Sequence, residues 1–118
     1  MREYKFRAWD KKEEKMISRF LPDWGNINQE RYLLLQFTGL YDKNLKEIYE
    51  GDIVTGVNIN GEDYTGNHEV VYIGSCFCIK IKKGINNKHD YEPCLDESWL
   101  ERMEVIGNIY ENPELIKE

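Results

Sequence analysis

The sequence lacks long apolar runs and an excess of basic charge, and these two absences exclude several classes of protein. No stretch approaches the roughly 18 apolar residues that a membrane-spanning helix needs. The opening segment MREYKFRAWD carries charges where a signal peptide has its apolar core. Acidic residues outnumber basic residues by 22 to 16, and the net charge of −6 disfavours binding to nucleic acid phosphates. We therefore expect a cytoplasmic protein with no membrane partner.

Cysteine and histidine are also scarce, with three and two residues. An odd number of cysteines without a secretory signal predicts free thiols. The side chains of His68, Cys76, Cys78, His89 and Cys94 would suffice for a zinc ion by number. Their spacing contains no C-x-x-C pair, however, and is not that of a zinc finger or ribbon. Since glycine-rich phosphate-binding motifs are missing as well, the sequence predicts neither a metal nor another cofactor.

Short segments with strand character fill most of the chain instead. Apolar and polar residues alternate in YKFRA, and the runs YLLLQFT, DIVTGVNI, HEVVYIG and CFCIKIK are rich in β-branched and aromatic residues. The dipeptide Asn60-Gly61 can supply the positive φ angles of a tight hairpin. We predict a mainly β protein in which residues 52–59, 68–73, 77–82 and 105–110 share one antiparallel, barrel-like sheet.

The C-terminal third contains two possible helical segments. In LDESWLERM, the residues Leu95, Trp99 and Met103 recur every four positions, which fits one face of a helix and equally an irregular segment with a single helical turn. The segment NPELIKE has the start signals of a short C-terminal helix, with Asn112 as its N-cap and Pro113 in its first turn.

The segment CFCIKIK allows a prediction about the cysteines. On a strand, Phe77, Ile79 and Ile81 point to one face, and Cys76 and Cys78 point to the other face together with two lysines. We expect the first face to be buried and the cysteines to lie on the less buried side, where a loop or a partner could cover them. The alternative is that the cysteines lie in the core as small apolar residues, as free cysteines commonly do. The two cysteines should not bridge each other, because their Cα atoms would stand about 6.5–7 Å apart.

Two groups of charged residues are candidates for a functional site. In KEIYEGDIV, the acids Glu50 and Asp52 flank Gly51 directly before a β-branched run. Such a pair could serve acid–base catalysis, but we predict a turn in which Gly51 adopts a conformation other residues avoid and Asp52 accepts backbone N–H groups. The second group is a lysine cluster, which is usually a solvated surface and is here a possible interaction site: Lys80, Lys82, Lys83 and Lys88.

Three segments of the chain resemble the hallmark blocks of the YopX family of phage and prophage proteins, in the family's order: YKFRAWDKKEEKMI, FTGLYDKNLKEIYEGDIV and VIGNIYENPELI. The resemblance implies a single domain in which residues 46–118 form a small, partly open SH3-like β-barrel and residues 1–45 form an N-terminal β segment packed on it. It also implies a phage or prophage gene expressed in a bacterial cytoplasm. The family has no established activity, so the resemblance supplies no catalytic residues.

These blocks contain residues that we interpret as structural, namely Gly39, Glu50, Gly51, Asp52, Asn112 and Pro113. Leu45 departs from the family pattern, in which a glycine often follows DKN. Because leucine tolerates a positive φ poorly, we expect a looser or different turn at this position.

The function that we predict is a non-catalytic interaction. The protein would bind a phage or host protein, or it would assemble with copies of itself through a strand edge or an apolar patch of its first forty residues. The alternative is a nucleic-acid-associated module that uses the face from Lys80 to Lys88, which the net charge disfavours. We expect no enzyme activity.

Overall fold

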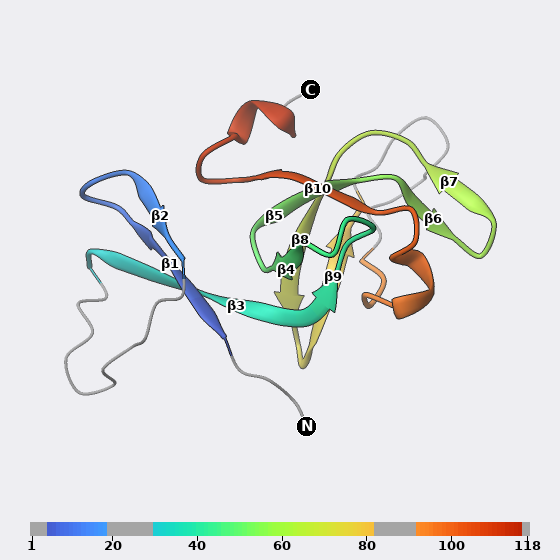
Figure 1. Ribbon diagram of the computed structural model, residues 1–118, viewed down its shortest axis with the longest axis horizontal. Helices are drawn as coiled ribbons and strands as arrows, with labels where there is room; N and C mark the ends of the chain where they lie inside the picture. Colours follow the sequence, from blue (N-terminus) through green and yellow to red (C-terminus); the bar gives the residue numbers. More distant parts are fainter. Residues whose placement is uncertain (1–4, 19–29, 82–91, 117–118) are drawn as a thin grey trace.

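The computed structural model describes residues 5–18, 30–81 and 92–116, which form short strands in two larger sheets and one small hairpin (Figure 1). The strands are β1 (Phe6–Asp10), β2 (Lys15–Ile17), β3 (Tyr32–Tyr41), β4 (Glu47–Tyr49), β5 (Asp52–Thr55), β6 (Val57–Ile59), β7 (Glu62–Tyr64), β8 (His68–Ile73), β9 (Cys76–Lys80) and β10 (Glu104–Asn108). Two 3-10 turns, η1 (Glu97–Trp99) and η2 (Pro113–Leu115), are the helical elements of the described residues.

The first sheet has the order β2-β1-β3-β4 and contains the N-terminal strands. The central strand β1 pairs antiparallel with both neighbours, and Ala8 lies opposite Leu34 of β3. Asp10 closes the turn after β1, because its carboxylate accepts hydrogen bonds from the backbone N–H groups of Lys12 (3.0 Å) and Glu13 (3.1 Å). In Figure 1, β3 runs from this hairpin to the second sheet.

The second sheet has the order β10-β5-β8-β9 and is antiparallel throughout. This order confirms the prediction that four segments of the C-terminal two thirds share one sheet. The sheet is curled into a half-barrel, which confirms the mainly β, partly open barrel class. Its core consists of aliphatic side chains with one tryptophan and one methionine: Ile48, Val54, Val57, Ile59, Val70, Ile79, Ile81, Trp99, Met103 and Val105.

The predicted strand over residues 52–59 is broken into β5 and β6 at Gly56. This glycine has a φ of 73°, and a Cβ atom there would lie 2.1 Å from the carbonyl oxygen of Arg102. The close approach of two backbone segments therefore ends β5. The separate strand β6 pairs with β7 around Asn60 (φ 53°) and Gly61 (φ 88°), which is the tight hairpin turn that the dipeptide predicted.

The C-terminal segments are less helical than the sequence suggested. Around Trp99 the irregular alternative is correct, with the single turn η1. The predicted C-terminal helix is only the 3-10 turn η2, and Asn112 makes no capping hydrogen bond with its side chain. Its Oδ1 atom instead accepts a hydrogen bond from the backbone N–H of Asn108 (3.2 Å), which ties the turn to the end of β10. No helix in the described part of the chain is long and apolar enough to span a membrane.

Two glycines with similar backbone angles allow the steric requirement at Gly56 to be tested. Gly39 has a φ of 88° and open space within 4 Å of where a Cβ atom would lie, whereas Gly56 faces the Arg102 carbonyl. We expect Gly39→Ala to cost about 1 kcal/mol of unfolding free energy from its φ angle alone. Gly56→Ala should cost a further ~1–3 kcal/mol because the backbone must move. Urea unfolding of both variants measures the difference, and equal losses would contradict the steric account.

Candidate functional site

The acidic pair Glu50 and Asp52 lies at the corner where the chain passes from the first sheet to the second. The Asp52 carboxylate accepts a hydrogen bond from the backbone N–H of Tyr49 (2.8 Å) and forms an ion pair with Arg7 of β1. The Glu50 carboxylate accepts a hydrogen bond from the backbone N–H of Gln36 (2.9 Å). Both acids are therefore bound to groups of their own chain.

Gly51 makes the corner between these two acids possible. Its φ is 87°, its N–H donates to the carbonyl of Val70 (2.8 Å), and its own carbonyl accepts from the N–H of Ile109 (2.9 Å). A Cβ atom would lie 2.9 Å from the ring of Tyr110. Only glycine combines this left-handed conformation with such close contacts, so the residue is required by the geometry of the corner.

The electrostatics of Asp52 could suggest catalysis, since perturbed carboxyl groups often occur in active sites. Burial raises the pKa of Asp52, and the positive charge of Arg7 opposes this shift. The side chain is 2% exposed, however, and both of its oxygens already accept hydrogen bonds. Because a general acid or base must reach its substrate, this arrangement serves the fold better than a reaction.

The lysine cluster is only partly visible in the described residues. Lys80 is half-buried on β9, where it lies directly opposite Glu69 of β8. The other three members of the predicted cluster, Lys82, Lys83 and Lys88, lie outside the described residues. The one member of this cluster that the structure describes, Lys80, therefore lies beside an acidic residue.

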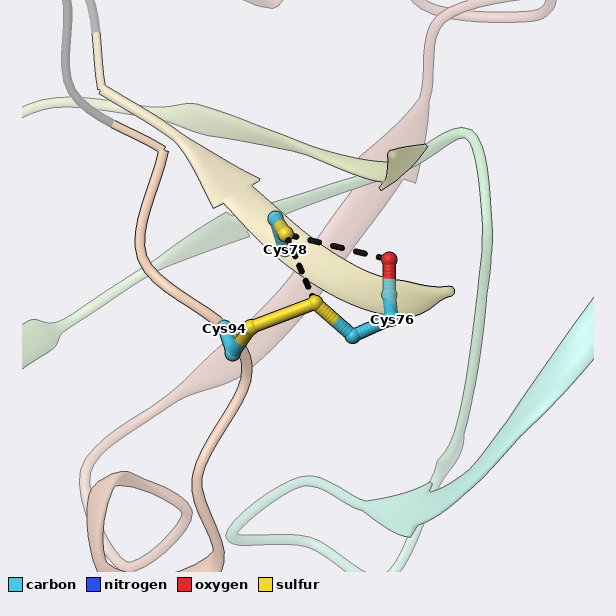
Figure 2. Close-up of a disulfide and its surroundings, with 3 residues drawn as sticks. All are labelled: Cys76, Cys78 and Cys94. Atoms are coloured by element: carbon cyan, nitrogen blue, oxygen red, sulfur yellow. Dashed lines mark hydrogen bonds between the residues drawn. A yellow bond between two sulfur atoms is a disulfide. The ribbon is translucent and has the colours of Figure 1, made fainter. Parts of the chain in front are cut away.

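The three cysteines come together at one edge of the second sheet (Figure 2). Cys76 and Cys94 form a disulfide, so the prediction of three free thiols is wrong for this pair. Cys76 and Cys78 do not bridge each other, as predicted, although their Sγ atoms lie 3.5 Å apart. The segment that contains Cys94 follows β9 closely enough for Cys94 to form a β-bridge with Cys78. Sequence spacing concealed this cluster, because the disulfide partners are 18 residues apart.

The predicted register of β9 is only half correct. Phe77, Ile79 and Ile81 are buried, as expected. Cys78 is also buried, with 3% exposure, whereas Cys76 on the same face of the strand is half-buried. The segment around Cys94 is a loop of the kind that the prediction allowed as cover. It pairs with the edge of β9 and brings the sulfur atoms of Cys76 and Cys94 beside that of Cys78. Here the N–H of Ile79 donates to the carbonyl of Pro93 (3.0 Å), and the carbonyl of Phe77 accepts from the N–H of Leu95 (2.8 Å).

Burial also determines the reactivity of the remaining thiol. It raises the pKa of Cys78, and the nearby carboxylate of Glu92 raises the pKa further. Since the thiolate is the nucleophilic form, a buried thiol with a raised pKa is a poor nucleophile at neutral pH. The two histidines are the other candidate metal ligands. His68 directs Nε2 to the carbonyl of Tyr64 (3.2 Å), and His89 lies outside the described residues.

Apolar side chains are exposed at the ends of two hairpins. Tyr41 and Leu45 lie at the end of the β3–β4 hairpin, and Tyr72 and Ile73 lie at the end of the β8–β9 hairpin. Leu45 is the extreme case, with 81% of its surface exposed. It also has a φ of 62°, so this leucine adopts the left-handed conformation that we expected it to avoid. In the sequence, the feature that pointed to this exposed residue was the leucine at position 45, where members of the family often have a glycine.

These features define a small, mainly β protein with a curled half-barrel sheet, an N-terminal β-hairpin and buried acids that hold its turns. The chain belongs to the YopX family, whose sequence profile, described as YopX protein, matches residues 20–117. The crystal structure of protein EF1440 from Enterococcus faecalis is similar, with a TM-score of 0.63 and 25% sequence identity over 99% of this chain and 100% of that chain. No functionally curated protein matches the sequence.

The role of the corner can be tested by removing the charge of Asp52. We expect Asp52→Asn to lower the unfolding free energy by about 3–5 kcal/mol, because it leaves the charge of Arg7, whose side chain is 12% exposed, without its buried partner. Glu50→Gln is the matched control, since the amide keeps an oxygen for the N–H of Gln36, and it should cost less than about 1 kcal/mol. Urea unfolding near neutral pH compares the two. Equal losses would show that the ion pair does not stabilise the corner.

Proposed function

We propose that this protein is a non-catalytic interaction module, encoded by a phage or prophage and working in the bacterial cytoplasm. It binds a phage or host protein or assembles with copies of itself. The observation that carries the proposal is the exposed, left-handed Leu45 at the end of the β3–β4 hairpin. A left-handed conformation costs about 1–2 kcal/mol for a residue with a Cβ atom, and Leu45 gains little packing within its own chain in return.

The turn that presents Leu45 is fixed by the buried Asp42. One carboxylate oxygen accepts hydrogen bonds from the N–H groups of Asn44 (2.8 Å) and Lys46 (2.9 Å), and the other accepts from the N–H of Val105 in β10 (2.9 Å). Burial alone would raise the pKa of Asp42, but these three donors outweigh it and lower the pKa. The leucine is therefore held in place on a rigid support, and such preorganisation lowers the entropic cost of binding.

A second side chain extends the apolar surface along the same hairpin. Tyr41 is 39% exposed, and its ring packs edge-on against Phe37 with 5.5 Å between the ring centroids. Rigid aromatic side chains of this kind are typical of the anchors that contribute most to protein interfaces. The sequence-based prediction placed the apolar patch within the first forty residues, and the present proposal uses Tyr41 and Leu45 instead. We favour this surface over a nucleic acid interface, because the one described member of the lysine cluster lies opposite Glu69.

The proposal predicts that stability and association change in opposite directions when Leu45 is replaced. Leu45→Gly relieves the backbone strain, so we expect the melting temperature to rise by roughly 2–5 °C. The same change removes the apolar anchor, so self-association at tens of micromolar should weaken in sedimentation experiments. If the wild-type protein is monomeric, the phage or host proteins that it captures should no longer be captured by the Leu45→Gly variant.

Leu45→Met is the matched control, because it keeps both a large apolar side chain and the unfavourable φ. It should bind like the wild type and should not gain thermal stability. Binding that is unchanged in Leu45→Gly would overturn the proposal for this surface. A salt-dependent gel shift with mixed nucleic acids would overturn the choice of a protein partner.

A further inference from the structure

We propose that the three cysteines bind a thiophilic metal ion, such as Zn²⁺, when the disulfide is reduced. The ligands would be the Sγ atoms of Cys76, Cys78 and Cys94. This inference does not depend on the proposed interaction through Leu45, which lies on a different hairpin.

The spacing of the sulfur atoms is the first argument. All three Sγ atoms lie within 4.8 Å of one another, and those of Cys76 and Cys78 are 3.5 Å apart. Zinc–sulfur bonds of about 2.3 Å in a tetrahedral site place the sulfur atoms ~3.8 Å from each other. Opening the disulfide would let the sulfur atoms of Cys76 and Cys94 separate to this distance. Figure 2 shows the three side chains directed toward one another from β9 and the neighbouring segment.

The second argument is that the backbone, and not the disulfide alone, holds Cys94 beside β9. The residues on either side of it, Pro93 and Leu95, are hydrogen-bonded to Ile79 and Phe77 of the strand. Leu95 also packs against the hydrophobic core. After reduction, Cys94 should therefore remain next to the other two thiols, which gives a largely preformed set of ligands.

The third argument is the exposure of the cluster, which differs from one sulfur to the next. Cys78 is buried, Cys76 is half-buried and Cys94 is exposed, so an ion can enter from the solvent side and reach a covered inner ligand.

The number and type of the ligands also fit a metal ion. A disulfide uses two sulfur atoms and leaves the role of the third unexplained, whereas a metal ion uses all three. Thiolate ligands select zinc and copper(I) over hard cations such as Mg²⁺. Three protein ligands leave a fourth position on zinc for water.

The chemistry needs a two-electron reductant, which a dithiol supplies. The dithiol becomes a cyclic disulfide as the bond between Cys76 and Cys94 breaks. The sulfur atoms of Cys76 and Cys94 become thiols. A divalent ion then displaces one proton from each of the three thiols, so binding releases up to three protons. A reducing cytoplasm would keep the cluster in this metal-binding form.

The test uses the full chain without a polyhistidine tag, reduced with a phosphine under anaerobic conditions. Addition of Co²⁺ should produce sulfur-to-metal charge-transfer absorption that saturates at one ion per chain, and Zn²⁺ should abolish it by displacement. Zn²⁺ should also raise the melting temperature of the reduced protein relative to the protein in chelator. The oxidised protein should show neither effect, because two of its three ligands are joined.

Cys78→Ala is the critical variant, since it leaves the disulfide pair intact. Its oxidised form, with a melting temperature close to that of the oxidised wild type, verifies that it folds. We expect the reduced variant to bind Co²⁺ and Zn²⁺ at least ~10–100-fold more weakly than the reduced wild type. Removing a residue that only hydrogen-bonds to a metal ligand already has an effect of this size, and Cys78 would be a ligand itself. A reduced wild type that binds no metal would overturn the proposal. So would a reduced Cys78→Ala variant that binds as tightly as the wild type.

Discussion

The buried ion pair between Arg7 and Asp52 is the interaction on which the rest of the structure depends. Arg7 lies on β1 in the first sheet, and Asp52 begins β5 in the second sheet, so the pair ties the two sheets together. The guanidinium of Arg7 also lies 4.7 Å from the centre of the Tyr49 ring. A buried ion pair contributes little net stability compared with well-packed apolar groups, but losing one partner is costly. Its main effect is therefore to fix how the sheets are joined.

Asp52 is one of three buried aspartates in the described residues that perform the same task at different turns. As whole residues, Asp10, Asp42 and Asp52 are 1%, 4% and 1% exposed, and each accepts at least one hydrogen bond from a backbone N–H close to it in sequence. Asp10 is further paired with Arg31 at 3.0 Å, and this hydrogen-bonded contact lowers the pKa of Asp10 to about 2. Carboxylates that satisfy backbone donors in this way make short strands and tight corners possible in a small protein. The acidic pair of the sequence thus belongs to a structural pattern repeated along the chain.

The parts of the fold that could be predicted are those that local chemistry determines. The β-branched runs indicated the strands of the second sheet, and Asn60-Gly61 indicated the hairpin turn. The failures have a different cause. The break at Gly56 depends on the carbonyl of Arg102, and the burial of Cys78 depends on the segment around Cys94. Both are contacts between segments distant in sequence, which periodicity cannot reveal. The cysteine cluster was rejected on spacing for the same reason.

Two features differ from the rest of the structure. Leu45 combines an unfavourable backbone conformation with an exposed apolar side chain, and Cys78 brings a third sulfur to a disulfide that needs two. Elsewhere in the described residues, positive φ angles occur at glycines and at the polar residues Glu14 and Asn60, and the buried acids have partners. In a sequence that is otherwise consistent, positions that break a local rule are the best indicators of function. Because these two positions lie on separate hairpins, a partner at Leu45 and a metal ion at Cys78 could be bound independently.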